Sequence, residues 1–126
     1  MDSNSVHSHN TEVAFDSLQV VDIHRLQEKW QEGWVSQTLC QVNDCVVRLG
    51  AGHGKFHWHK HDNEDEFFYV VEGRLIINLD ERTVELGPQQ GFTVPRGVVH
   101  CTEAPERTVI LMVEGSTVTP TGDSDQ

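Results

Sequence analysis

Short apolar runs recur along the chain from Val35 onward, and turn residues separate them. The runs hold four to eight residues, many of them β-branched or aromatic, and Gly, Pro, Asn or Asp stands at the breaks. This pattern predicts an all-β sandwich or barrel built from short strands. The runs are SQTLCQV, CVVRLG, EFFYVV, RLIINL, TVELG, GFTV and RTVILMVE. We expect a two-residue hairpin turn at 43–44, and turns between successive antiparallel strands at 72–73 and 80–81.

The run EFFYVV indicates which side chains face the interior. Side chains alternate between the two faces of a strand, so Glu66, Phe68 and Val70 share one face. If Glu66 points inward, Phe68 and Val70 line the interior beside it. The same alternation pairs Phe92 with Val94 and Ile110 with Met112. The predicted pocket is therefore largely apolar, as small-molecule sites tend to be, although any one of these residues is also suited simply to fill a core.

The N-terminal part is less regular. Residues 1–12 and 120–126 are polar and unpatterned, so we expect mobile tails around a single domain over residues 13–119. The segment LQVVDI, 18–23, predicts a first strand. Leu26 and Trp30 lie four apart and predict one helical turn that packs against the barrel mouth.

Composition limits the function classes. A chain of 126 residues can bury one core but not two. Its formal net charge of -11 disfavours nucleic acid and anionic membranes as partners. With no long apolar run and no signal-peptide pattern, we expect a cytoplasmic protein.

Three cysteines without regular spacing argue against a disulfide framework. A two-residue turn at 43–44 would set Cys40 opposite Val47 and Cys45 opposite Val42. We interpret Cys40 and Cys45 as small core residues. Cys101 follows His100 directly, and alternation turns it away from whatever His100 contacts.

The chemistry concentrates in the segment from His59 to His100. His59 and His61 are two residues apart, so both imidazoles point to one face of an extended chain. Glu66 begins the next strand, and His100 follows the turn residues 95–97. Three imidazoles and one carboxylate suit a first-row divalent ion and leave one or two coordination positions open. Two alternatives stay open: the histidines are solvated loop residues, or His57 with His59 forms the pair.

These motifs resemble a known family. HKHDNEDEFFYVVEG is similar to the first cupin motif, a His-x-His pair followed by Glu and Gly, and PRGVVH is similar to the core of the second. Residues 34–120 as a whole resemble the small single-domain cupins of the cupin 2 type, labelled "mannose-6-phosphate isomerase-like", with an RmlC-like jelly roll. The resemblance implies a jelly-roll β-barrel (double-stranded β-helix) and the metal ligands His59, His61, Glu66 and His100. Gln89 and Ala104 depart from the second motif without removing a ligand.

The resemblance and the residues together leave two functional hypotheses. In the first, the protein is a metal-dependent dioxygenase, isomerase or lyase that acts on a small oxygenated molecule. In the second, the metal-loaded barrel only binds or senses a small ligand. The ion could be Fe, Mn, Ni, Co or Zn, because the ligand set does not choose among them. A purely structural or metal-storage role is the third, least favoured reading.

Partners and catalytic groups are harder to assign. A sugar phosphate needs cationic groups, and we interpret the candidates Arg48, Arg74 and Arg96 as solvated surface residues. No catalytic residue beyond the ligands is evident, because the only tyrosine, Tyr69, alternates out of phase with Glu66. Exposed sheet edges and the family resemblance suggest a homodimer. Its contact would use the segment near residues 18–22 or the edge at 30–35.

Overall fold

A computed structural model describes residues 8–28, 30, 33–119 and 122 of the chain. It contains one short helix and eight strands. They are β1 (Ser8–Asn10), α1 (His24–Gln27), β2 (Trp34–Val42), β3 (Cys45–Lys55), β4 (Glu66–Glu72), β5 (Leu75–Asn78), β6 (Thr83–Leu86), β7 (Gly91–Val94) and β8 (Cys101–Gly115). The all-β class predicted from the sequence is confirmed.

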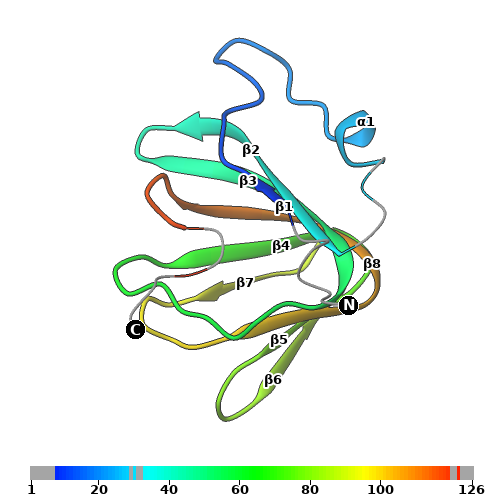
Figure 1. Ribbon diagram of the computed structural model, residues 1–126, viewed down its shortest axis with the longest axis vertical. Coiled ribbons are helices and arrows are strands. Elements are labelled where there is room, and N and C mark those ends of the chain that lie inside the picture. The colour runs from blue at the N-terminus through cyan, green and yellow to red at the C-terminus, as the bar shows by residue number, and fades with distance from the viewer. Residues whose placement is uncertain (1–7, 29, 31–32, 120–121, 123–126) are drawn as a thin grey trace.

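All strands belong to one strongly curved sheet in the order β1-β2-β3-β8-β4-β7, with the β5–β6 hairpin joined to β8. Figure 1 shows this hairpin at one end of the stack of strands and α1 at the other, beside β2. The long strand β8 pairs with β3 on one edge. On its other edge it pairs with β5 over residues 101–103 and with β4 over residues 109–114. One strand thereby holds three others in register.

The main core lies between the facing walls of this sheet. Buried residues of β4, β5, β7 and β8 meet here, and the sequence alternation correctly placed Phe68, Val70, Val94 and Ile110 among them. The buried set is Trp34, Phe56, Phe68, Val70, Leu75, Ile77, Leu86, Val94, Ala104 and Ile110. Each fully buried Leu, Ile or Phe stabilises the fold by about 1.5–3 kcal/mol.

A second apolar cluster covers the opposite face of β2, β3 and β8, where Leu39, Leu49, Ala51 and Val109 are buried. The N-terminal segment supplies its cover: Phe15, Ile23, Leu26 and Trp30 pack against it. The predicted helical turn is therefore present, but the prediction that it packs against the barrel mouth is wrong. It lies on the outer sheet face, because that face is apolar as well.

The side chain of Arg107 holds the helical turn against the sheet. The guanidinium of Arg107, on β8, donates from Nη2 to the carbonyl of Gln27 at 2.7 Å and from Nε to the carbonyl of Trp30 at 3.1 Å. The Gln27 carbonyl belongs to the last residue of α1, where intrahelical donors are missing, and the Trp30 carbonyl lies three residues beyond it. The side chain thus links the covering segment to the central strand.

The predicted strand over residues 18–23 is wrong. The described chain there forms a turn and an irregular stretch, Leu18 has a positive φ of 74°, and Leu18 and Val20 are fully exposed or nearly so. Its β-branched residues lack a free strand to pair with, because the outer edge of β2 is already occupied. Backbone amides of Ala14 and Phe15 donate to the carbonyls of residues 38 and 39.

The edge of β2 also pairs with residues near the N-terminus. Ser8–Asn10, inside the region for which we expected a mobile tail, pairs in parallel with residues 35–37 as β1. The sheet therefore starts before residue 13. Residues 1–7 and most of 120–126 lie outside the described residues, so the tails there stay a prediction.

Two of the three predicted turns join paired strands. The turn at 43–44 sets Val42 opposite Cys45 and Cys40 opposite Val47, as predicted, and the β5–β6 hairpin encloses residues 80–81. The turn at 72–73 does not form a hairpin. β4 and β5 lie end to end along β8 and do not pair with each other, and Gly73 turns the chain with a φ of 94°.

The cysteines are all free. Cys101 is buried and its thiol donates to the carbonyl of Phe56 at 3.0 Å, away from the histidines, as alternation predicted. Cys40 is partly buried in the second cluster. Cys45 is exposed, so its interpretation as a core residue is wrong, because it lies at the hairpin end where no segment covers the sheet.

Candidate metal centre

Three separate segments bring the four predicted residues together. His59 and His61 lie on the connection between β3 and β4, Glu66 is the first residue of β4, and His100 directly precedes β8. Reciprocal backbone hydrogen bonds of 2.9 Å join His59 and His100. This isolated bridge holds the histidine loop against the start of the central strand.

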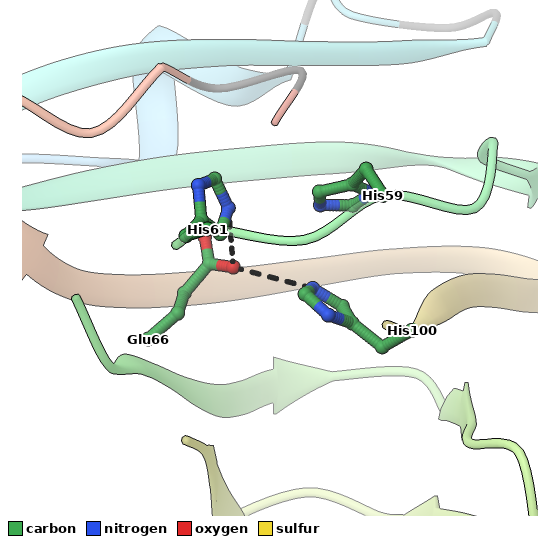
Figure 2. Close-up of side chains that lie close together, drawn as sticks. All are labelled: His59, His61, Glu66 and His100. Carbon is green, nitrogen blue, oxygen red and sulfur yellow. Dashed lines mark ion pairs between the residues drawn. The ribbon is translucent and has the colours of Figure 1, made fainter. Parts of the chain in front are cut away.

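One ligand atom from each of the four side chains lies within 4.8 Å of the others. Figure 2 shows the Glu66 carboxylate between two imidazoles, with His59 on the far side of the same space. Glu66 Oε1 lies 3.2 Å from His61 Nε2 and 3.5 Å from His100 Nε2. The arrangement could hold one metal ion.

Backbone carbonyls select the tautomer of two imidazoles. His59 Nδ1 lies 3.0 Å from the carbonyl of His57, and His100 Nδ1 lies 3.0 Å from the carbonyl of Val98. A carbonyl only accepts, so each Nδ1 carries the proton and donates it. The lone pair of each ring is then on Nε2, which is the arrangement that orients neutral imidazoles toward a metal.

Buried polar atoms in this cluster lack ordinary partners. His61 Nε2, Glu66 Oε1 and His100 Nε2 are buried and have no hydrogen-bond partner among the described residues. Each buried polar group without a hydrogen-bond partner lowers the free energy of unfolding by about 1–3 kcal/mol. A cation would satisfy all three together, so the residues present fit a divalent metal ion.

Burial shapes the charge states of the cluster. Desolvation, and then the neighbouring His100, lowers the pKa of His59 from 6.5 to about 4. Burial alone would raise the pKa of Glu66, but interactions with Glu114, His100 and His61 outweigh it and hold that pKa below its ordinary value. The cluster thus combines an ionised carboxylate with an imidazole that resists protonation, which is the state a metal ion requires.

A pocket opens beside the cluster within the barrel. His59 and Glu66 form part of its wall, Phe68, Ile110 and Met112 form an apolar wall, and the cavity measures about 50 Å³. Of the apolar residues predicted to surround the pocket, Phe68, Ile110 and Met112 line it, whereas Val70, Phe92 and Val94 do not. The pocket also contains polar groups that the sequence did not assign to it.

The structure corrects the sequence interpretation of Arg48. It is 4% exposed, lines the pocket and forms an ion pair with Glu114 of β8, so the interpretation as a solvated surface residue is wrong for Arg48. Arg74 and Arg96 are exposed and pair with surface carboxylates. The inward orientation of Glu114 could have been predicted from the sequence, because Glu114 continues the alternation of Ile110 and Met112.

Glu114 lies opposite Glu66 in the pairing of β4 with β8. Burial, followed by the neighbouring Glu66, raises the pKa of Glu114 to about 10 against the opposing charge of Arg48. Two close carboxyl groups cannot both ionise readily. The pair therefore favours one shared proton at neutral pH, which leaves a single negative charge beside Arg48.

His57, the alternative ligand, does not join the cluster. Its side chain is exposed, and its ring packs on Phe56 with a centroid distance of 4.3 Å. The chain between His57 and His61 is not a regular strand, so side-chain parity does not turn His57 inward. The structure brings His59 and His61 together instead.

The segment after β8 returns to this site. Val118 is buried, and its carbonyl accepts a hydrogen bond of 2.9 Å from Arg48. Gly122 lies so close to His59 that a Cβ atom there would stand 2.5 Å from the His59 Cβ. Gly122 also has a φ of 94°, which favours glycine.

The described residues contain no helix with the length and hydrophobicity that a membrane crossing requires.

The family model described as "Cupin domain" matches residues 45–114. The uncharacterized protein YdbB of Bacillus subtilis (strain 168) is 41% identical over 78 residues, which cover 61% of this chain and 69% of that protein. Polyketide synthase CurC of Streptomyces cyaneus is 32% identical over 92 residues, 64% of this chain and 57% of that relative. The chain thus spans less than two thirds of CurC.

Solved structures show the same fold. A cupin-2 domain containing protein from Shewanella frigidimarina NCIMB 400 superposes with a TM-score of 0.71 at 28% identity, covering 76% of this chain and 94% of that one. KdgF from Halomonas sp. superposes with a TM-score of 0.62 at 20% identity, covering 67% of this chain and 81% of that one.

In the metal-free protein, the His59 imidazole is expected to stay neutral through the ordinary histidine range and to bind its proton only near pH 4. Since the folded pKa lies below that of the unfolded chain, the folded state binds this proton less readily. The contribution of His59 to the free energy of unfolding therefore falls as the pH drops from 6.5 toward 4. A pH titration of imidazole ¹⁵N chemical shifts measures this directly, and a midpoint at the ordinary value would contradict it.

Proposed function

The chain belongs to the cupin domain family, and from that premise we propose that it binds one divalent transition metal ion and acts on a small oxygenated molecule. His59, His61, Glu66 and His100 are the proposed ligands. The observation that carries the proposal is the convergence of their ligand atoms within 4.8 Å, with three of those atoms buried and without hydrogen-bond partners.

The ion would supply Lewis acidity or hold a substrate oxygen, which suits dioxygenase, isomerase or lyase chemistry. The chain itself contributes the surroundings. The apolar wall of the pocket excludes water from one side of the cluster, and the carbonyls of His57 and Val98 keep two imidazoles in the binding tautomer. Glu114 adds a second buried carboxyl group beside Glu66, a group able to exchange a proton that the sequence interpretation lacked.

The relatives support the substrate class only broadly. One of them is named a polyketide synthase, and polyketides are compounds rich in carbonyl and hydroxyl oxygen. The identity of the metal follows from neither the relatives nor the ligand set, because Fe, Mn, Ni, Co and Zn all accept three imidazoles and a carboxylate.

Removal of one ligand tests the metal site. His100→Ala is expected to weaken metal binding at least about tenfold and to abolish stabilisation by added metal, because an incomplete ligand set no longer compensates the buried Glu66. At a hundredfold excess of metal over Kd, the wild-type protein should gain about 2.7 kcal/mol, a rise in Tm of roughly 10 °C. Elemental analysis and thermal melting with each of the five ions measure both effects.

His57→Ala is the matched control for this experiment. It removes an imidazole two residues from His59 that lies outside the cluster, so it should keep full metal content and the full rise in Tm. If His57→Ala lost the metal and His100→Ala kept it, the proposed ligand set would be wrong.

Turnover separates an enzyme from the alternative, a non-catalytic binding or sensing protein. We expect the Fe(II)-loaded protein to consume dioxygen or convert substrate when small hydroxyketones and diketones are supplied, with His100→Ala inactive. An oxygen electrode and mass spectrometry of the recovered compounds provide the measurement. Recovery of a bound compound unchanged, with no oxygen uptake by any metal form, would favour the binding protein.

We further propose a homodimer that uses the segment 18–22. Leu18 and Val20 are the most exposed large apolar residues of the described chain. The other predicted edge is less suitable, because β1 pairs with Val35 and Trp34 is buried.

The double variant Leu18→Asp with Val20→Asp is expected to shift the protein from dimer to monomer in light scattering at micromolar concentration, because two charges would enter an apolar contact. Val42→Asp places a charge at another exposed apolar position and should leave the dimer intact. A wild-type protein that is monomeric would contradict the proposal.

A further inference from the structure

The pocket has a polar wall that the proposed metal chemistry does not use. Arg48 on β3 and Glu114 on β8 are 4% and 3% exposed and lie on the pocket side of the sheet. Their ion pair closes the pocket on the side of Glu66, whose Cα partner on β8 is Glu114. A ligand in this pocket can therefore contact both the metal cluster and these two side chains.

The hydrogen-bonding capacity of Arg48 is largely occupied by the protein. Nε donates to Thr38 Oγ1 at 3.1 Å, and Nη1 donates to Glu114 Oε2 and to the carbonyl of Val118, the latter at 2.9 Å. Guanidinium groups bind ligand carboxylates through paired donors. Each paired mode of a guanidinium uses Nε or Nη1, so a ligand carboxylate can bind Arg48 through two donors only by displacing Glu114 or another of these partners.

Glu114 has one oxygen that the protein does not use. Oε2 is bound to Arg48, whereas Oε1 is buried and has no hydrogen-bond partner among the described residues. A buried polar atom without a partner is costly, so its presence in a pocket wall points to a ligand group. A hydroxyl group suits it best, because a hydroxyl can donate to a carboxylate and accept from a carboxylic acid.

We propose that Glu114, held by Arg48, is the specificity-determining residue of the pocket and hydrogen-bonds a hydroxyl group of a small uncharged hydroxycarbonyl compound. Another oxygen of the same compound lies at the metal cluster, so this inference rests on the proposed function. The Glu114 carboxyl group already bonds the Arg48 guanidinium. Glu114 therefore also prevents a ligand carboxylate from binding to the same donor.

The size of the pocket limits the ligand. A cavity of about 50 Å³ has room for a few water molecules, at about 10–15 Å³ each. The pocket therefore favours a compact ligand over a bulky one. Gly50 preserves this space, because a Cβ atom there would stand 3.2 Å from both Ile110 Cγ1 and Met112 Cε.

Dihydroxyacetone and 3-hydroxypyruvate form a matched pair of probes. They share a hydroxyketone end, and they differ in that a hydroxymethyl group of the first is a carboxylate in the second. Each is titrated into the Co(II)-loaded protein, and changes in the visible absorption of Co(II) give the two Kd values. The quantity compared between variants is the ratio of the Kd of hydroxypyruvate to the Kd of dihydroxyacetone.

In Glu114→Ala, this ratio is expected to fall at least about tenfold, because the hydroxyl loses its partner and the carboxylate gains Arg48. Glu103→Ala is the matched control. It removes a carboxylate from the same strand that bonds Asn78 outside the pocket, so the ratio should stay within about twofold of wild type. Gly50→Val should weaken both compounds while the Co(II) spectrum without ligand stays the same.

The outcomes separate the two proposals. A wild-type protein that binds no Co(II) overturns the proposed function, and this inference with it. A protein that binds Co(II) but neither compound, or whose ratio is unchanged in Glu114→Ala, overturns the role of Glu114 alone. If Glu114→Ala does not fold, Glu114→Gln replaces it, with an expected fall of about threefold because the amide still partners Arg48, and an unchanged ratio again overturns the inference.

Discussion

The register of β8 against its neighbours is the constraint on which the rest of the structure depends. This strand pairs with β3 on one edge and with β4 and β5 on the other, and His100 stands immediately before it. The pairing of Glu66 with Glu114 places two carboxyl groups side by side on the inner face. A shift of one residue would turn every inward side chain of the strand outward. Pocket, ligand set and polar wall would be lost together.

The barrel interior contains several buried polar and charged side chains, and their burial needs a physical explanation. Arg48, Glu66, Glu114 and two of the clustered histidines are all almost fully buried. Removing such groups from water is costly unless they are paired. Arg48 and the single negative charge of the two carboxyl groups offset each other, whereas His61 Nε2 and His100 Nε2 have no hydrogen-bond partner in the described part of the chain. The charges of the polar wall are thus balanced within the chain, and the histidine cluster is the part that requires a cation.

The sequence predicted the parts of this arrangement that follow from local rules. The alternation of residues 66–70 placed Phe68 and Val70 in the core, and the turn at 43–44 set the register of its hairpin. The motif resemblance singled out the four residues that the structure brings together. Arg48 was misread because a lone arginine in an apolar run carries no local sign of its partner, which lies 66 residues later. The segment 18–23 was misread because strand propensity does not reveal that the edge of β2 is already occupied.

Position 122 shows how a residue outside the strands takes part in the site. Gly122 lies against the ring-bearing Cβ of His59 with a backbone conformation that side chains rarely adopt. A larger residue there would cost the barrel core little, since no core residue touches it in the clusters described, yet it would press on the imidazole. Substitution at position 122 is therefore constrained both by its backbone conformation and by the orientation of the His59 imidazole.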